Sequence, residues 1–126
     1  MNVLYWNCRG YRSSFEDLKV LLYNHKPSVV CLQETFHGNA TPFPPSRYSI
    51  FSANPVVQYA DGVRPSRGLL TLIHNTVAFE PININTNLEA IAFRIKLRNP
   101  TTVCNIYIAP NENINQNELS LSLIHI

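Results

Sequence analysis

The chain has 126 residues, of which 45% are hydrophobic and 14% charged, and its formal net charge is +2. These proportions are typical of one globular domain and leave no room for a second core. The longest apolar stretches, such as Leu69–Ile73, span only a few residues, whereas a membrane-spanning helix needs about 20. The sequence therefore excludes a transmembrane helix. The first residues lack the features of a secretory signal, so we expect an intracellular protein, either nuclear or cytoplasmic.

The three cysteines, Cys8, Cys31 and Cys104, include no Cys-x-x-Cys pair and cannot all form disulfides within the chain. This usage favours a reducing compartment. Cys31 and Cys104 lie in β-branched runs without the spacing of a zinc site, so we interpret them as small buried hydrophobic residues.

The basic residues are concentrated in the N-terminal part. Residues 1–75 hold seven Lys and Arg against four Asp and Glu, whereas residues 76–126 hold three against four. A polyanion would therefore meet the N-terminal part first.

The chain begins with the pattern of a strand, a helix and a second strand. Val3–Trp6 and Val29–Leu32 are apolar runs without alternation, which indicates strands buried on both faces. The residues between them predict a helix of about 11 residues that ends before Pro27. These three elements form a βαβ unit, so the two strands should run parallel with a right-handed crossover.

The start of this helix carries a capping signal. Ser13 and Ser14 are each followed three residues later by an acid, Glu16 or Asp17. This spacing predicts two overlapping capping boxes, in which the serine hydroxyls bond the first free backbone N–H groups of the helix.

The remaining elements are predicted from turn residues and alternation. Gly38–Pro65 is rich in proline and is expected to be a surface loop with one short strand near Tyr48–Phe51. Leu69–His74, Ala90–Leu97 and Thr101–Ile108 are predicted strands, the last two being antiparallel. We expect this meander to make the sheet mixed, in an α/β (α+β) fold.

The strand 90–97 has one apolar and one solvent-exposed face by alternation. The inward positions are Ile91, Phe93, Ile95 and Leu97, and the outward positions are Ala92, Arg94 and Lys96.

Two polar residues follow the predicted parallel strands directly. Asn7 comes after the first strand and Glu34, preceded by Gln33, comes after the second. The carboxyl ends of neighbouring parallel strands lie at one edge of the sheet, where open α/β sheets bind their ligands. Mg²⁺ prefers hard oxygen ligands and is often held by one carboxylate together with substrate phosphates. Glu34 is therefore a candidate metal ligand, although a solvated loop acid has the same pattern.

Three segments then resemble a known family. They are Leu4-Tyr5-Trp6-Asn7-Cys8-Arg9-Gly10, Val29-Val30-Cys31-Leu32-Gln33-Glu34-Thr35 and Asn105-Ile106-Tyr107-Ile108-Ala109-Pro110. In this order and spacing they resemble the first blocks of the endonuclease/exonuclease/phosphatase superfamily. Within it they are most similar to the apurinic-type endonuclease domain of non-LTR retrotransposons. The resemblance covers residues 2 to about 119.

This resemblance implies a fold, a reaction and a cofactor. The fold would be a DNase I-like β-sandwich flanked by helices. The activity would be hydrolysis of a DNA phosphodiester with Mg²⁺, or Mn²⁺ as an alternative, so that the nicked 3′-hydroxyl primes reverse transcription. The partners would be DNA, bound through its phosphate backbone, and a reverse transcriptase fused to the same chain, with no membrane.

The resemblance also implies roles for three residues. Glu34 would ligate the metal, Asn7 would hold the phosphate and metal network, and Tyr107 would hydrogen-bond a phosphate oxygen. These roles agree with the chemistry of a carboxylate, a neutral amide and a phenol. A turn asparagine and a core tyrosine remain the structural alternatives.

Further candidates are less specific. Asn111 lies near the position of a substrate contact in some relatives, or in a simple turn. Four loop arginines are candidates for DNA phosphate contacts and equally for surface charge: Arg9, Arg12, Arg64 and Arg67. His37 and His74 do not match the family's catalytic histidine and are interpreted as loop and strand-end residues.

The later blocks of the family, Gly-Asp-x-Asn and Ser-Asp-His, do not occur in these 126 residues. We therefore expect residues 1–120 to be the N-terminal part of such a domain, inactive alone, without the second sheet of the sandwich and with an exposed apolar face. Residues 121–126 match one translated frame of a sequencing adapter and are expected not to be native. The alternative for this segment is the start of an amphipathic helix.

Two other functions remain open. One is a phosphatase or phosphodiesterase of the same superfamily that acts on inositol phosphates or lipids. The other is a non-catalytic remnant of a decayed element.

Overall fold

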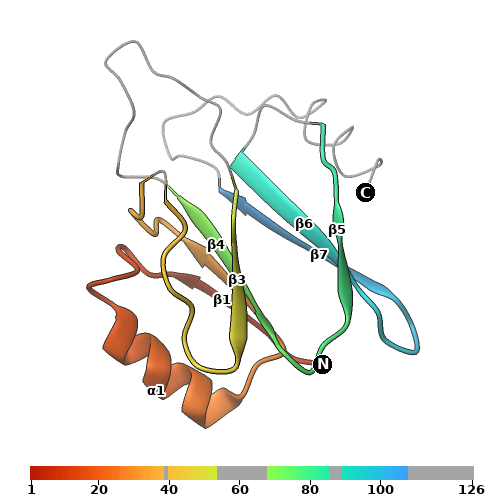
Figure 1. Ribbon diagram of the computed structural model, residues 1–126, viewed down its shortest axis with the longest axis horizontal. Helices are drawn as coiled ribbons and strands as arrows, with labels where there is room; N and C mark the ends of the chain where they lie inside the picture. The colour runs from red at the N-terminus through yellow and green to blue at the C-terminus, as the bar shows by residue number, and fades with distance from the viewer. Residues whose placement is uncertain (39, 54–67, 86–88, 108–126) are drawn as a thin grey trace.

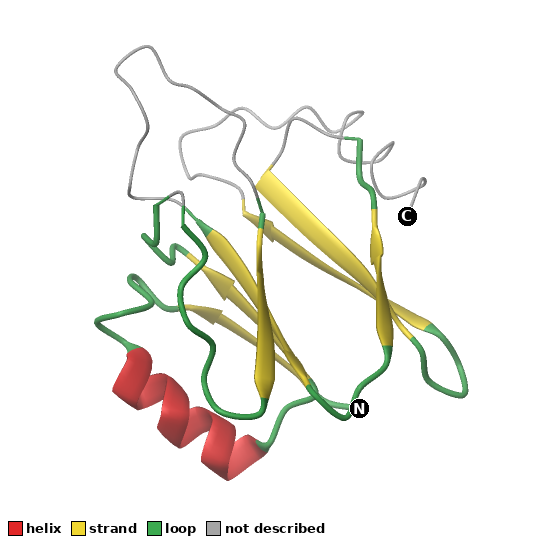
Figure 2. Cartoon of the chain, viewed as in Figure 1, coloured by secondary structure: helices red, strands yellow, loops and turns green. Residues whose placement is uncertain are grey.

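The computed structural model describes residues 1–38, 40–53, 68–85 and 89–107. One helix and two sheets are arranged in three layers, with α1 on one side of the first sheet and the second sheet on the other (Figures 1 and 2). The first sheet has the order β1-β2-β4-β3 and the second has the order β5-β6-β7. The elements are β1 (Val3–Asn7), α1 (Phe15–His25), β2 (Val29–Gln33), β3 (Tyr48–Ser52), β4 (Leu69–His74), β5 (Phe79–Ile82), β6 (Glu89–Ile95) and β7 (Thr101–Tyr107).

The predicted βαβ unit is confirmed. Strands β1 and β2 pair in parallel, with Val3 opposite Val29 and Asn7 opposite Gln33. The first four residues of β2 are fully buried, as expected for a strand that is covered on both faces. The same expectation is wrong for β1, because β1 lies at the edge of the sheet and Tyr5 is 57% exposed. Strand β4 pairs antiparallel with both β2 and β3, so the first sheet is mixed.

Helix α1 has the predicted length of 11 residues, but its capping differs from the prediction. Ser14 occupies the N-cap position without a side-chain capping bond. Its hydroxyl instead donates to the Cys8 carbonyl at 2.7 Å, and the Ser13 hydroxyl donates to the Gly10 carbonyl at 3.2 Å. The capping boxes were therefore a wrong prediction, because both serines hold the loop before the helix rather than the helix itself.

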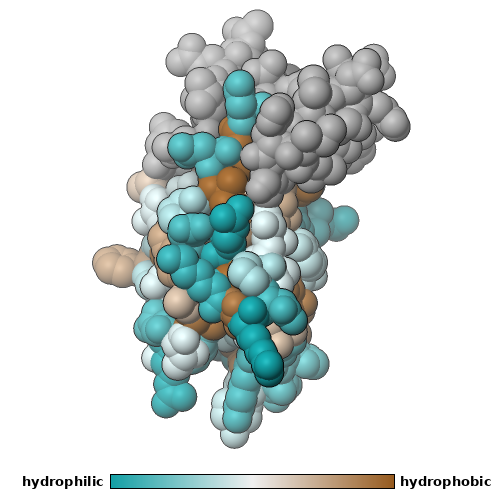
Figure 3. All heavy atoms as spheres, turned by 90° about the vertical axis from the view of Figure 1, so that its right-hand side faces the viewer, coloured by the Kyte–Doolittle hydropathy of each residue, from teal (hydrophilic) through white to brown (hydrophobic). Residues whose placement is uncertain are grey.

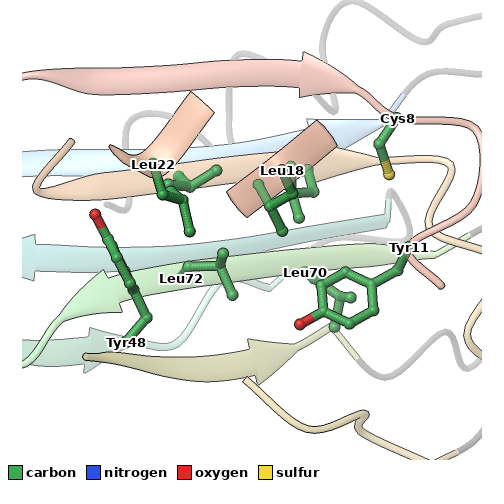
Figure 4. Packing of buried hydrophobic residues seen from close by; sticks show 9 residues of the cluster. Cys8, Tyr11, Leu18, Leu22, Tyr48, Leu70 and Leu72 are labelled. Carbon is green, nitrogen blue, oxygen red and sulfur yellow. The ribbon is translucent and has the colours of Figure 1, made fainter. Parts of the chain in front are cut away.

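One face of the first sheet packs against α1 (Figure 4). Leu18 and Leu22, four residues apart on the helix, lie over Leu70 and Leu72 of β4. Tyr48 closes one end of this cluster, where its buried hydroxyl donates to the Pro27 carbonyl at 2.7 Å.

The other face of the first sheet packs against the second sheet, which the sequence did not predict. The meander was expected to extend the mixed sheet, and the apolar face was expected to be exposed. Instead β5, β6 and β7 form a separate antiparallel sheet. The core between the two sheets is formed by buried residues of both. The first sheet contributes Val29, Cys31 and Ile73, and the second contributes Phe93, Ile95 and Val103. The described part of the chain thus contains two layers of a β-sandwich.

Three phenylalanines lie in the contact between the sheets. The ring centroids of Phe51, Phe79 and Phe93 are 5.1 to 5.6 Å apart, in edge-on or tilted arrangements. Because Phe51 comes from the first sheet and the other two from the second, this cluster joins the two layers.

The outer face of the second sheet is polar, as the alternation predicted for Arg94 and Lys96. Both side chains are ion-paired with Glu80, at 3.3 and 3.8 Å. Hydrophilic and near-neutral residues cover most of the described part of this side of the molecule (Figure 3).

Two positions of the predicted strand 90–97 differ from the prediction. Ala92 was expected to face solvent but is only 1% exposed. Its register neighbours on the flanking strands are Ile82 and Cys104. Leu97 was expected to be buried but is 41% exposed, because β6 already ends at Ile95.

The short strand expected near Tyr48–Phe51 is confirmed as β3, whereas part of the loop 38–65 lies outside the described residues. Within the described ranges, no helix is long and apolar enough to cross a membrane.

We expect Phe93→Ala to lower the free energy of unfolding by about 3–5 kcal/mol, because Phe93 is 2% exposed and its removal leaves a cavity between the sheets. Urea denaturation measures this change. Phe43→Ala is the matched control, since Phe43 is 91% exposed and should change stability by less than about 0.5 kcal/mol. Equal effects of the two substitutions would contradict the described packing.

Candidate functional site

The loops after β1 and β2 lie side by side at the carboxyl edge of the first sheet. Three backbone hydrogen bonds continue the parallel pairing beyond the strands: Cys8 N–H to Gln33 O at 3.1 Å, Gly10 N–H to Glu34 O at 2.8 Å and Tyr11 N–H to Thr35 O at 2.8 Å. This pairing fixes the segment that carries Glu34 against the loop that follows Asn7.

Glu34 has a left-handed backbone conformation, with φ of 50°. A non-glycine residue in this region costs about 1–3 kcal/mol, and such residues cluster at functional sites. The bond from Gly10 N–H to the Glu34 carbonyl helps to hold this conformation. As a result, the chain turns at the end of β2, and the half-buried Glu34 side chain does not continue the alternation of the strand.

Tyr107, the last residue of β7, meets Glu34 from the second sheet. Its hydroxyl donates to Glu34 Oε1 at 2.8 Å. Hydrogen bonds to a carboxylate are stronger than neutral ones, so this contact orients the carboxylate. Within the described ranges, no residue hydrogen-bonds Glu34 Oε2.

Asn7 lies at the end of β1, opposite Gln33 in the parallel register. Its position in the alternation places it on the face that carries Val3, which is the face toward the second sheet. Asn7 is exposed, and its amide makes no hydrogen bond within the described part of the chain. The structure therefore brings Asn7, Glu34 and Tyr107 to one edge but bonds only the last two directly.

A compact cluster supports the loop after Glu34. The Thr35 hydroxyl is hydrogen-bonded to His37 Nδ1, and Thr35 N–H donates to the Gly68 carbonyl at 3.2 Å. Gly68 has φ of +137°, and a Cβ there would lie 2.4 Å from Thr35 Oγ1. Only glycine fits this position, so the start of β4 can pack directly under the loop.

His37 is a loop residue, as predicted, but it is also buried, with 8% exposure. Burial lowers the pKa of His37, and the nearby charge of Arg12 lowers it further. His37 is therefore neutral near pH 7.

The candidate DNA-contacting arginines are only partly described. Arg9 and Arg12 are exposed in the loop between β1 and α1, next to the Glu34 segment. Arg64, Arg67 and Asn111 lie outside the described residues.

The thiols are not suited to nucleophilic chemistry. All three cysteines are free. Burial raises the pKa of Cys31 to about 12 and also raises the pKa of Cys8. Cys31 is fully buried as predicted, whereas Cys104 is only half-buried. His74 ends β4, as expected.

Two residues of the site, Gln33 and Asn105, were not singled out from the sequence as functional. Asn105 of β7 is 1% exposed and bonds across to the first sheet, where Gln33 is one of its partners. A polar residue two positions before Tyr107 on the same face was the available signal, but its partners are more than 30 residues away.

The profile of the endonuclease/exonuclease/phosphatase family matches residues 4–121. The chain belongs to this family. Its members include hydrolases of phosphate esters, in agreement with a carboxylate at the edge of the sheet.

Solved structures of family-like proteins share the fold. The endonuclease domain of TRAS1, a telomere-specific non-LTR retrotransposon, superposes with a TM-score of 0.68 over 97% of this chain at 15% identity. The AP endonuclease LMAP from Leishmania major gives 0.66 over 95% at 17% identity. The chain covers 52% and 43% of these two structures, or about half of their length. No curated protein sequence matches this chain.

The predicted DNase I-like fold is thus confirmed for the described part of this family member. At this level of identity the likeness shows the fold alone, and the roles of Asn7, Glu34 and Tyr107 remain predictions.

We expect the stability of the protein to fall as the pH is lowered from 7.5 to 5.5, in part because of His37. The pKa of His37 is lowered in the folded state, so the unfolded state binds a proton first as the pH falls below about 6.5. His37→Gln should flatten this dependence of the free energy of unfolding. His25→Gln, at an exposed position of α1, is the control, and an equal effect of both would contradict the burial of His37.

Proposed function

We propose that this chain forms part of a Mg²⁺-dependent endonuclease that nicks DNA to prime reverse transcription in a non-LTR retrotransposon. The observation that carries the proposal is the Glu34 carboxylate, which is oriented by Tyr107 beside Asn7 at the carboxyl edge of a parallel strand pair. The sequence blocks around these residues and the likeness to a retrotransposon endonuclease domain support the choice of substrate.

The residues present fit a magnesium ion. No group of three or more His, Cys, Asp or Glu side chains is found among the described residues, which is unlike a dedicated all-protein metal cage. Mg²⁺ instead keeps several waters and takes one or two carboxylates together with substrate phosphate oxygens. Glu34 Oε2 and the amide oxygen of Asn7 are hard ligands of this kind. When bound, the ion would neutralise charge on the scissile phosphate.

The side chains of this chain would then act by positioning. Tyr107 holds Glu34 Oε1 and so fixes which carboxylate oxygen faces the substrate. The hydrogen bond from its hydroxyl to Glu34 supports a role in orienting the carboxylate. The bond from Tyr107 to a phosphate oxygen stays a prediction. Asn7 can donate a hydrogen bond to an anionic oxygen without titrating.

DNA would approach over the loop between β1 and α1. Arg9 and Arg12 are exposed there, and contacts to phosphates give affinity that depends on salt but little on sequence. The exposed side chain of Arg9 directly follows the Asn7-Cys8 segment, which places a positive charge next to the candidate metal site.

We expect a protein that contains this chain within its complete reading frame to nick supercoiled plasmid DNA when Mg²⁺ is present. Glu34→Gln keeps the shape of the side chain but removes its charge, and should lower the rate about 10²–10³-fold. Glu16→Gln, on the exposed face of α1, is the control and should nick like the wild type. The assay is conversion of supercoiled to open-circular plasmid.

Nicking by Glu34→Gln at the wild-type rate would contradict the proposal and favour a non-catalytic remnant. Hydrolysis of inositol phosphates without any DNA nicking would instead favour a phosphatase of the same family.

We also expect Arg9→Ala to weaken DNA binding at low salt and to reduce the slope of log affinity against log salt by about 0.9, as loss of one phosphate contact predicts. Arg98→Ala, in the turn between β6 and β7, is the control for a general loss of positive charge. Fluorescence anisotropy with a duplex oligonucleotide at several salt concentrations measures both. An equal change of slope in the two variants would show that Arg9 makes no specific contact.

A further inference from the structure

A buried amide joins the two sheets directly below the candidate site. Asn105 of β7 is 1% exposed, and its Nδ2 lies 3.0 Å from the Leu70 carbonyl, 3.2 Å from Thr71 Oγ1 and 3.4 Å from the Leu32 carbonyl. Its Oδ1 accepts a hydrogen bond from Gln33 Nε2 at 2.9 Å. All of these partners belong to β2 and β4 of the first sheet, so one side chain of the second sheet is bonded only to the opposite layer.

This amide is not needed to fill the space between the sheets. Phe93, Ile95 and Val103 fill the neighbouring positions of the second sheet with apolar groups. A buried polar group is costly unless it is hydrogen-bonded, and an apolar side chain would occupy the same layer without that cost. The amide instead fixes the position of β7 relative to β2 and β4, because its hydrogen bonds can form in only one placement of β7 over these strands.

The same two segments carry the candidate site. Asn105 and Tyr107 are two residues apart and therefore lie on one face of β7. Gln33 and Glu34 are consecutive at the end of β2. The bond from Gln33 to Asn105 at 2.9 Å and the bond from Tyr107 to Glu34 at 2.8 Å thus connect the same pair of chain segments.

We propose that Asn105 and Gln33 are positioning residues, which set the placement of the Tyr107 hydroxyl against the Glu34 carboxylate by fixing the second sheet over the first. This inference rests on the proposed function for its catalytic consequence, but its structural core, the control of the Tyr107–Glu34 contact, does not.

Gln33→Met tests the proposal with little risk to folding. Gln33 is only partly buried, and methionine keeps its length while removing the donor to Asn105. A double variant, Gln33→Met with Asn105→Leu, replaces both partners by apolar groups of similar shape, a change that can be nearly neutral for stability. The double variant keeps the test valid if an unpaired Asn105 lowers the melting temperature.

The matched control is Tyr48→Phe. It also removes a buried hydrogen bond, from the Tyr48 hydroxyl to the Pro27 carbonyl, but at the opposite end of the first sheet. A purely structural effect of losing one buried bond would appear in this variant as well.

The first measurement is the NMR signal of the Tyr107 ring Cζ and hydroxyl, made in the complete protein together with the melting temperature. We expect folded Gln33→Met protein to shift or broaden this signal, whereas Tyr48→Phe leaves it unchanged. An unaltered Tyr107 signal in folded Gln33→Met and in the folded double variant would overturn the proposal, whatever the enzymatic activity.

The second measurement is the affinity for Mn²⁺, followed by electron paramagnetic resonance, and the rate of plasmid nicking. Loss of an outer-shell partner typically lowers metal affinity or activity 10–100-fold, and we expect a loss in this range for Gln33→Met. In a Tyr107→Phe background the same substitution should add little, because both act on one contact. Full additivity would overturn the role in positioning.

These outcomes separate the two proposals. If the Tyr107 signal responds to Gln33→Met but the wild-type protein neither binds Mn²⁺ nor nicks DNA, the proposed function fails while the positioning role stands. If the wild type nicks DNA and neither the Tyr107 signal nor the rate responds to Gln33→Met, the positioning role fails alone.

Discussion

The parallel pairing of β1 with β2 is the constraint on which the candidate site depends. Since the two strands run in the same direction, their carboxyl ends meet, and three backbone hydrogen bonds extend the pairing into the following loops. This extension places the left-handed residue Glu34 beside the loop after Asn7. The strain at Glu34, about 1–3 kcal/mol, is sustained because the surrounding structure is well anchored: β2 is buried along almost its whole length and Gly68 leaves room for the loop above it. A side chain at Gly68 would remove that support.

Much of the first sheet could be predicted from the sequence because its signals are local. Uninterrupted apolar runs predicted β1 and β2, the residues between them predicted α1, and the run at Leu69–His74 predicted β4 with its observed bounds. The second sheet could not be predicted in the same way. Alternation in β6 shows which side chains face a core, but it does not show which layer covers them, so the meander was joined to the wrong sheet. The capping prediction for the serines before α1 was wrong for a related reason. Their hydroxyls donate to loop carbonyls that come near only in the folded chain.

The same contrast between local signals and distant contacts holds for the candidate site. Asn7 and Glu34 follow strands of one local βαβ unit, so their shared edge was predictable from topology. Tyr107 was recognised through its sequence block, but its partner was not, since 73 positions of chain separate it from Glu34. Asn105 shows the limit most clearly. Asparagine is uncommon in strands, but the residue type does not show what it contacts. Its importance follows from four polar partners on the opposite sheet.

The magnitudes explain how packing and positioning can be separate tasks in this fold. The six buried apolar residues shared by the two sheets contribute about 1.5–3 kcal/mol each as an upper estimate, whereas a typical hydrogen bond contributes about 1 kcal/mol. The apolar layer therefore holds the sheets together, whereas the hydrophobic effect itself is non-directional. Directional contacts set the position of one sheet over the other at little cost in total stability. Tyr107 lies on the second sheet and Glu34 follows a strand of the first. A small displacement of β7 along the first sheet would therefore separate the two side chains while the fold stays intact. The polar hydrogen bonds between the two sheets oppose such a displacement.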